Sequence, residues 1–333
     1  MKRDANIELL RVILMLGVCM VHAFAVVRPP SIWLRGVVAC SVDAFVFISG
    51  YYGIRFSLRK LGALYMTGLV SCAMGALVGG IVLGTDFLIG HGGYWVVVRD
   101  FLTKHCWFLH SYAVLMIFAP LINTAMNNCT RKEALKIGLP IVGLVFIWSW
   151  GTTACGSWRL HLPTVPGFGS LSPLTLIGIY IVARLYQLFA LQKHIKVWWV
   201  VMVFLTLPWL SGCGYGGYNG PIVLVLAIGL FTLFKNMRLS SDSFIVCNKK
   251  WQYVIPSLFA CYLITDTPAG RQIMHAVCDN KLENWCGKGV LCAIVLGVGT
   301  FVVGLILDIP RRLAVGLIDM YVQRSKANIC SNE

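Results

Sequence analysis

Arg11 and His22 have the types and the spacing to do chemistry together within one apolar segment, residues 7–27. The ten residues between them are nearly all apolar. At about 100° per residue, eleven steps return to within roughly 20° of the start, so both side chains share one face of a helix. A histidine can accept and release a proton near neutral pH, and an arginine can bind an anion through its planar fork of donors. The pair therefore indicates proton transfer beside an anion, unless Arg11 extends to the membrane surface and His22 is a hydrogen-bonded core residue.

Asp43 lies near the middle of the next apolar segment, residues 31–54. A carboxylate buried in an apolar segment must be neutral or paired. Because only a few residues join the two segments, we expect antiparallel neighbours and predict His22 as the partner of Asp43. The acid would then orient the imidazole and stabilise its protonated form. Counting from the shared end places Asp43 roughly 10 Å deeper than His22, so the contact needs a tilt of the helices.

Two further groups of residues are weaker candidates for binding. Arg55, Arg59 and Lys60 follow the second segment and could hold the phosphates of a nucleotide-like donor, or they could simply be the basic residues of a cytoplasmic loop. His105, Trp107 and Asn123 flank or lie in the segment 107–126 and could bind an acceptor. Alternatively, His105 and Trp107 anchor the helix at the membrane interface.

The elements that must position these residues are apolar helices. The chain has 333 residues, of which 58% are hydrophobic and only 12% are charged, and apolar runs recur from end to end. This balance predicts an all-α, polytopic membrane protein. The net charge of +15 comes from basic residues in short loops between the apolar runs, so we expect no nucleic-acid partner. The cysteines show no CxxC spacing and indicate no metal site, while a pairing of Cys278 with Cys286 is left open.

We expect about ten membrane spans in a single domain, 1–333, with no attached soluble domain. The predicted spans are 7–27, 31–54, 61–84, 107–126, 136–153, 171–189, 195–211, 220–236, 251–266 and 288–309. With the N-terminus inside, nineteen of the 28 Lys and Arg residues fall in cytoplasmic segments, eight fall outside, and Arg11 lies within a span. This asymmetry predicts that both termini are cytoplasmic. Because we expect no attached soluble domain, any chemistry must use the membrane helices and their loops.

Three of the motifs together resemble acyltransferase family 3, the integral membrane O-acyltransferases that modify bacterial polysaccharides. They are Arg-x10-His over 11–22, Val-Asp-x-Phe-x-Phe-x-Ser-Gly over 42–50, and Trp-Phe-Leu-x3-Ala-x-Leu followed by Pro-x-x-Asn over 107–123. The helix with Gly178, Tyr180 and Arg184 is similar to a later family motif.

The segment Tyr-Leu-Ile-Thr-Asp-Thr-Pro over 262–268 is similar to another. There, Thr265 stands where relatives often have histidine, so we predict no catalytic role for this segment.

The resemblance implies that an acyl group, most often acetyl, passes from acyl-CoA to a sugar hydroxyl of an envelope glycan or its lipid-linked precursor. His22 would be the catalytic base and Asp43 its partner. Arg11 would be a cation on the donor side or a structural cation. Acetyl-CoA would be a substrate rather than a permanently bound cofactor. The expected location is the bacterial cytoplasmic membrane, among membrane lipids, and the oligomeric state is left open. Because no Ser or Cys pairs with His22 in the sequence pattern, we expect direct transfer without an acyl-enzyme.

Two other classes of function compete with this interpretation. A transporter or flippase could use Arg11, His22 and Asp43 as a path for protons or substrate, although no internal repeat supports a two-part transporter. A membrane glycan polymerase would also be polytopic. Such an enzyme is expected to have a large outer loop with several arginines, and the longest outer loops here hold at most two or three basic residues.

Overall fold

The structure is a computed structural model, and it describes residues 4–27, 31–100, 103, 106–151, 171–211, 217–237, 254–278 and 289–316. All regular secondary structure in these ranges is helical, as the composition predicts. The main helices are α1 (Ala5–Val27), α2 (Ile32–Ala39), α3 (Ser41–Tyr52), α4 (Leu58–Leu83), α5 (Thr85–Gly90), α6 (Tyr94–Asp100), α7 (Trp107–Asn128), α8 (Arg131–Val142), α10 (Pro173–Leu188), α11 (Val197–Leu210), α12 (Pro221–Asn236), α15 (Leu258–Asp266), α16 (Pro268–Val277) and α18 (Val290–Leu307). A π-helix continues α8 over Gly143–Trp148, and short 3-10 turns cover Leu191–Lys193 and Ile255–Ser257.

Six helical segments within the described ranges are long and apolar enough to cross a membrane: Ala5–Val27, Ile32–Tyr52, Leu58–Leu83, Trp107–Asn128, Arg131–Gly151 and Val290–Gly316. Four apolar helices are shorter: Pro173–Leu188, Val197–Leu210, Pro221–Asn236 and Ile255–Asp266. Each predicted apolar segment therefore contains a helix. The count of ten crossings and the cytoplasmic location of both termini remain predictions.

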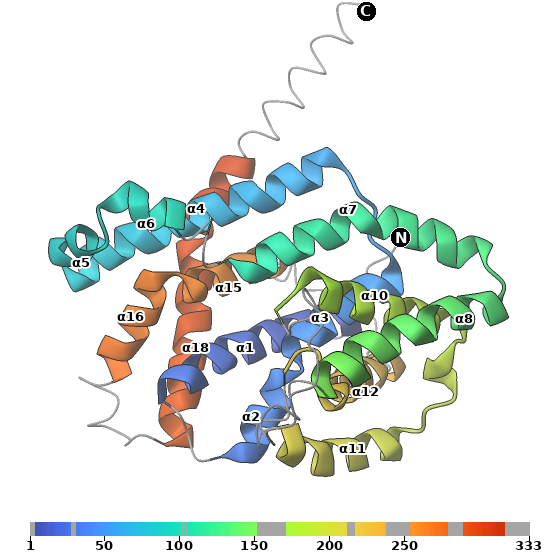
Figure 1. Cartoon of the computed structure of the whole chain (residues 1–333). Coiled ribbons are helices and arrows are strands. Elements are labelled where there is room, and N and C mark those ends of the chain that lie inside the picture. The colour runs from blue at the N-terminus through green and yellow to red at the C-terminus, as the bar shows by residue number, and fades with distance from the viewer. Residues whose placement is uncertain are drawn as a thin grey trace, which may run out of the picture.

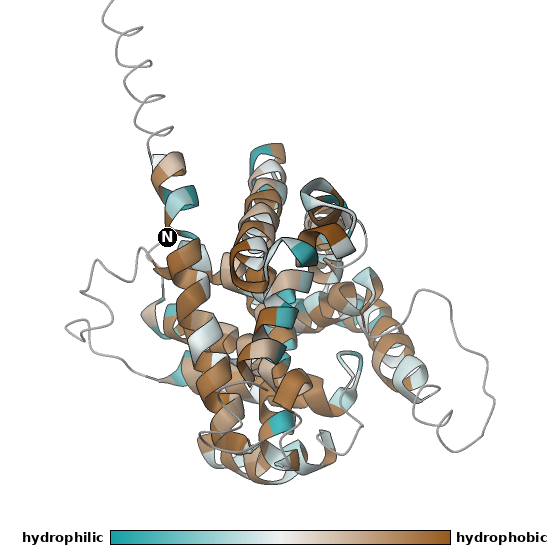
Figure 2. Ribbon diagram, turned by 90° about the vertical axis from the view of Figure 1, so that its left-hand side faces the viewer, coloured by the Kyte–Doolittle hydropathy of each residue, from teal (hydrophilic) through white to brown (hydrophobic). Residues whose placement is uncertain are grey.

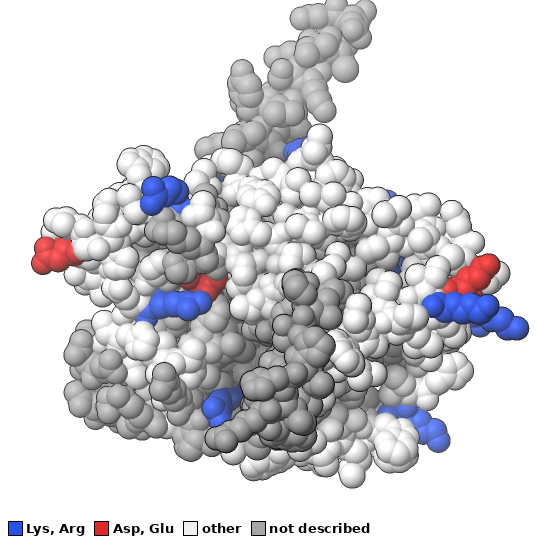
Figure 3. All heavy atoms as spheres, viewed as in Figure 1, with Lys and Arg blue, Asp and Glu red and all other residues white. Residues whose placement is uncertain are grey.

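The surface of the helices is suited to lipid. Apolar residues dominate the ribbon in Figure 2, and large apolar side chains such as Met66, Leu121, Trp199 and Val302 are exposed on α4, α7, α11 and α18. On the face shown in Figure 3, the area over α4 and α7 is mostly neutral, and charged side chains gather toward the two sides, near α5 and α6 and near α8. A neutral band between two charged margins is the pattern of a chain embedded in a bilayer.

Helix α1 runs through the centre of the bundle (Figure 1), where it packs against α2, α3, α12, α15, α16 and α18. Leu10, Leu14, Cys19 and Ala23 on this helix are almost fully buried. The surrounding helices leave one side of α1 free of close packing, and the candidate site lies along that side.

The second apolar segment is not one continuous helix, because α2 ends and α3 begins at Cys40. The start of α3 approaches α1 closely at Gly17, where a Cβ atom would lie 2.2 Å from Ser41 Oγ. Only glycine permits this approach, so the contact fixes the height of α3 relative to α1. It therefore determines which α1 residues Asp43 can reach.

Capping residues define where several helices begin. Ser57, Thr130, Ser172 and Thr267 each accept a hydrogen bond from a backbone N–H of the first turn of α4, α8, α10 and α16. Such caps satisfy donors that the helix itself leaves open. The cap at Thr267 separates α15 from α16 and so places the end of α15, with Thr265 and Asp266, beside α1.

The predicted pairing of Cys278 with Cys286 falls partly on residues outside the described ranges. Within those ranges, Cys278 is buried at the end of α16. Its Sγ atom lies 3.9 Å from Sγ of Cys292 on α18. That distance is a thiol contact rather than a disulfide.

Candidate active site

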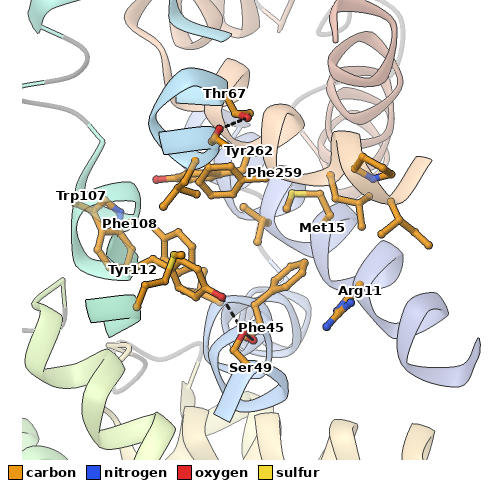
Figure 4. A pocket seen from close by; sticks show the side chains of 18 of the residues that line it. Arg11, Met15, Phe45, Ser49, Thr67, Trp107, Phe108, Tyr112, Phe259 and Tyr262 are labelled. Atoms are coloured by element: carbon orange, nitrogen blue, oxygen red, sulfur yellow. Dashed lines mark hydrogen bonds between the residues drawn. The ribbon is translucent and has the colours of Figure 1, made fainter. Parts of the chain in front are cut away.

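A cavity of about 430 Å³ lies between α1, α3, α4, α7 and α15 (Figure 4). Most of its lining is apolar. The polar residues of the lining are Arg11, His22, Ser49, Lys60, Thr67, Trp107, Tyr112, Tyr218 and Tyr262. The cavity thus contains two of the three residues predicted to be catalytic.

One face of α1 forms a long wall of this cavity. Arg11, Met15, Val18 and His22 all line it, and their spacing of three or four residues is that of a single helix face. Arg11 and His22 lie about 16 Å apart along the axis, at 1.5 Å per residue. The prediction that both side chains share one face is confirmed, and the space between them is apolar.

Arg11 points toward the cavity (Figure 4) while its Nη1 atom donates to Glu8 Oε1 at 2.8 Å. Glu8 is largely buried and Arg11 is about one-third exposed. A guanidinium has five N–H donors, and this ion pair engages one of them. The remaining donors leave Arg11 able to bind an anion that enters the cavity.

His22 is held by Thr265 on α15, whose Oγ1 atom lies 2.8 Å from Nδ1 of the imidazole. The Thr265 hydroxyl donates its only proton to the Tyr262 backbone carbonyl, at 2.8 Å. Thr265 Oγ1 can therefore only accept from His22, so Nδ1 carries the ring proton. In the neutral imidazole, Nε2 then carries the lone pair and is the basic atom.

A second layer of polar contacts supports this arrangement. The Tyr262 hydroxyl donates to Asp266 Oδ2 at 3.1 Å, and Arg271 forms an ion pair with the same carboxylate. The Tyr262 ring also lies against His22, with centroids 5.9 Å apart. Tyr262, Thr265 and Asp266 thus belong to one network behind the imidazole.

The predicted partner of His22, Asp43, is not part of this network. Asp43 is completely buried, and neither carboxyl oxygen has a hydrogen-bond partner among the described residues. The contact between Gly17 and Ser41 explains why Asp43 does not reach His22. Asp43 lies two residues beyond that contact and His22 lies five residues away in the other direction, which separates them by roughly 10 Å along the axis. The predicted hydrogen bond is therefore not formed, and a catalytic role of Asp43 remains a prediction.

Comparison with known families assigns the chain. A family model described as an acyltransferase domain matches residues 4–309. The chain belongs to acyltransferase family 3. No curated protein and no solved structure matches it. The protein is thus a membrane acyltransferase in the general sense of this family, and the match confirms the resemblance that the motifs indicate.

In this family 3 acyltransferase, the segment that includes Thr265 is closer to the candidate base than sequence reasoning predicted. The resemblance of residues 262–268 to a family motif was the available signal. Threonine cannot replace histidine as an acid or base, so the motif alone indicates no catalytic role. The structure shows a different use, in which Thr265 binds the imidazole of His22.

The predicted donor-binding residues divide into two groups. Lys60 lines the cavity together with Arg11, and its Nζ atom donates to the Arg55 carbonyl at 3.0 Å. Arg55 and Arg59 are exposed and do not line the cavity. Within the described part of the acyltransferase, Arg11 and Lys60 are therefore the cations that a ligand in this cavity would meet.

Of the predicted acceptor-binding residues, Trp107 lines the cavity and stacks on Tyr218, with ring centroids 5.4 Å apart. His105 lies outside the described residues. Tyr218 was not predicted, since it lies in a short loop without a motif. Because its ring packs on Trp107, Tyr218 closes the cavity on this side.

Asn123 does not line this cavity, and its predicted role in binding substrate remains a prediction. Its amide donates to the Ile54 carbonyl at 3.1 Å and accepts from the Tyr180 hydroxyl at 2.8 Å. The Tyr180 oxygen in turn accepts from the Ile54 backbone N–H at 2.8 Å. These bonds clamp the turn after α3, where Gly53 has a φ of 76°. Two of the family motifs, at Asn123 and Tyr180, thus meet to hold the end of α3.

Proposed function

We propose that this acyltransferase moves an acetyl group from acetyl-CoA to a sugar hydroxyl of a cell-envelope or exported polysaccharide, in the bacterial cytoplasmic membrane. The observation that carries the proposal is the environment of His22. Thr265 holds Nδ1 in its protonated form, and the imidazole lines the cavity. Nε2 is then available as a general base for a hydroxyl that enters this cavity.

Acetyl-CoA fits the cavity with its phosphates at the end where Arg11 and Lys60 lie. Coenzyme A carries its phosphates at one end and its thioester at the other end of a long, mostly neutral arm. Arg11 and Lys60 at one end of the cavity suit the phosphates, and the apolar wall of Met15, Val18 and Phe45 suits the arm. The thioester would then lie near His22.

The transfer needs one base and one site for the developing negative charge. The acceptor hydroxyl oxygen attacks the thioester carbonyl carbon while His22 Nε2 takes the hydroxyl proton. The resulting tetrahedral intermediate expels the thiolate as its C–S bond breaks. The proton on Nε2 then passes to the thiolate sulfur, which gives the sugar ester and free coenzyme A. No acyl-enzyme is required, in agreement with the expectation from the sequence.

Tyr218 is our candidate donor for the oxyanion of the intermediate. Its ring lines the cavity beside Trp107. Burial raises the pKa of the Tyr218 phenol above its usual value. The hydroxyl therefore stays protonated over the physiological range and can donate to an oxyanion, an interaction that stabilises charge only as it develops.

The test is transfer of labelled acetyl from acetyl-CoA to envelope glycan by the purified protein in a lipid bilayer. His22→Ala should lower the rate by about 10²–10⁴-fold, the usual contribution of a general base. His194→Ala, at an exposed position that does not line the cavity, is the matched control and should transfer at the wild-type rate. A folded His22→Ala protein with full activity would remove His22 as the base, and a wild type that never transfers acetyl would remove the proposed function.

A further inference from the structure

A second cavity, of about 410 Å³, continues the first along α1. Arg11, Met15, Val18 and His22 line the first cavity, whereas Phe24 and Ala25 line the second. The two cavities share Val21 and Tyr218 in their walls. They therefore meet next to His22, at the end of the first cavity opposite Arg11.

The second cavity is apolar apart from two residues. Val38, Ala39 and Phe24 form much of its wall, and Arg35 and Tyr218 supply its polar groups. A ligand there would pack its apolar faces against these side chains, and the Tyr218 ring offers an apolar face together with a polar hydroxyl. Its volume is within the usual range for small-ligand sites.

Arg35 is the charged residue in the lining of this cavity, and its side chain is exposed. It differs from the arginines that pair with acidic residues elsewhere in the bundle. Arg11 pairs with Glu8, Arg271 with Asp266 and Arg311 with Asp308. Arg35 has no ion pair or hydrogen bond through its side chain to any residue in the described ranges. A guanidinium in a largely apolar cavity, without such a partner, is a strong recognition element for a planar anion.

We propose that the second cavity binds the acceptor and that Arg35 recognises a carboxylate on it, so that the enzyme selects an acidic sugar. This inference rests on the proposed function and adds the substrate class and the place of the acceptor. The donor occupies the first cavity from the Arg11 end, and the acceptor occupies the second cavity from the Arg35 end. Their reactive groups meet where Val21 and Tyr218 join the two cavities, beside His22.

The experiment compares two glycosides that differ only at one carbon. The probes are p-nitrophenyl glucuronide, which carries a carboxylate, and p-nitrophenyl glucoside, which carries a hydroxymethyl group there. Binding to the full chain in phosphatidylcholine nanodiscs is measured by isothermal titration calorimetry, without acetyl-CoA. We expect the wild type to bind the glucuronide about 10–100-fold more tightly, the range of a charge-assisted hydrogen-bonded pair.

Variants assign this preference to one side chain. Arg35→Gln should bind both glycosides alike, and Arg35→Lys should keep part of the preference because it retains the charge but loses the bidentate fork. Arg131→Gln removes an exposed arginine on α8 that lines neither cavity, and it should keep the full preference. Equal or absent binding of the two glycosides to the wild type, or a preference that survives in Arg35→Gln, would overturn the inference.

Two further measurements separate the sources of failure. If phosphatidylglycerol in the nanodisc displaces the glucuronide and does so only with Arg35 present, the cavity is a lipid-phosphate site and the inference is wrong. Acetyl transfer is then measured separately with both glycosides. Arg35-dependent binding without any transfer would leave the site in place and remove the proposed function, whereas equal transfer to both glycosides would keep the function and remove the selection of acidic sugars.

Discussion

Asp266 and Asp43 are both buried acids near the candidate site, and their surroundings are opposite. Asp266 accepts from the Tyr262 hydroxyl and pairs with Arg271. Asp43 has no hydrogen-bond partner among the described residues. A carboxyl buried in that way is neutral, since an isolated buried charge is far too costly. A buried acid in a membrane helix therefore marks a special position but does not by itself reveal its partner.

The two acids also differ in how they relate to His22. Asp266 belongs to the same turn of α15 as Thr265, which binds the imidazole. Asp43 belongs to α3, whose height is fixed by its contact with Gly17. The polar network that supports the base therefore comes from the late segment of the chain, and the following predictions test that network against the isolated acid.

Among the residues around the base, the largest effect is expected at Thr265. Thr265→Val removes the acceptor of the Nδ1 proton, so the imidazole loses its fixed tautomer and orientation. Because a wrong tautomer disables a general base, we expect kcat for acetyl transfer to fall about 10²-fold or more. Thr265→Ser keeps the hydroxyl and should retain most of the activity.

Thr67→Val provides the matched control for this change. Thr67 lines the same cavity, but its hydroxyl donates to the Ala63 carbonyl at 2.8 Å and does not contact His22. The kcat of the Thr67→Val variant should stay within a few-fold of the wild-type value. Equal losses in Thr67→Val and Thr265→Val would mean that the cavity is sensitive to any lost hydroxyl, and that the tautomer has no special role.

A smaller effect is expected at the other end of the cavity. Arg11→Lys keeps a positive charge but loses the planar fork, so KM for acetyl-CoA should rise about 10-fold while kcat changes little. Steady-state kinetics with varied acetyl-CoA measure both quantities. If kcat falls instead and KM is unchanged, Arg11 acts on the transition state and is not a donor-binding cation.

The sequence could predict whatever depends on the regular geometry of one helix. The apolar segments and the common face of Arg11 and His22 follow from the helical period alone. The hydrogen bond between His22 and Thr265 joins residues 243 positions apart, and it depends on how α15 packs against α1. No periodicity contains that information. The break at Cys40 and the close approach at Gly17, which keep Asp43 from His22, are likewise properties of packing.

The two acids should also differ in their effect on stability. Asp266→Asn removes the charge that pairs with Arg271 and weakens the bond from Tyr262. We expect a loss of about 1 kcal/mol in the free energy of unfolding, since Arg271 is half exposed and its share is screened by solvent. Thermal unfolding of the protein in one fixed detergent measures the difference. A midpoint equal to that of the wild type would show that the network behind His22 does not hold α15 in place.

The smallest effect is expected for Asp43→Asn. A neutral carboxyl and an amide have nearly the same shape, and Asp43 has no hydrogen bond to a described residue that the change could break. The free energy of unfolding should therefore change by less than the roughly 1 kcal/mol expected for Asp266→Asn, because the substitution breaks no hydrogen bond of the described residues. Acetyl transfer by the same preparation then decides whether Asp43 has a chemical role. Full activity would separate Asp43 from catalysis. A large loss of activity with an unchanged unfolding midpoint would mean that Asp43 gains its partner only when acyl-CoA or the acceptor is bound, and the contrast with Asp266 would then hold for the free enzyme alone.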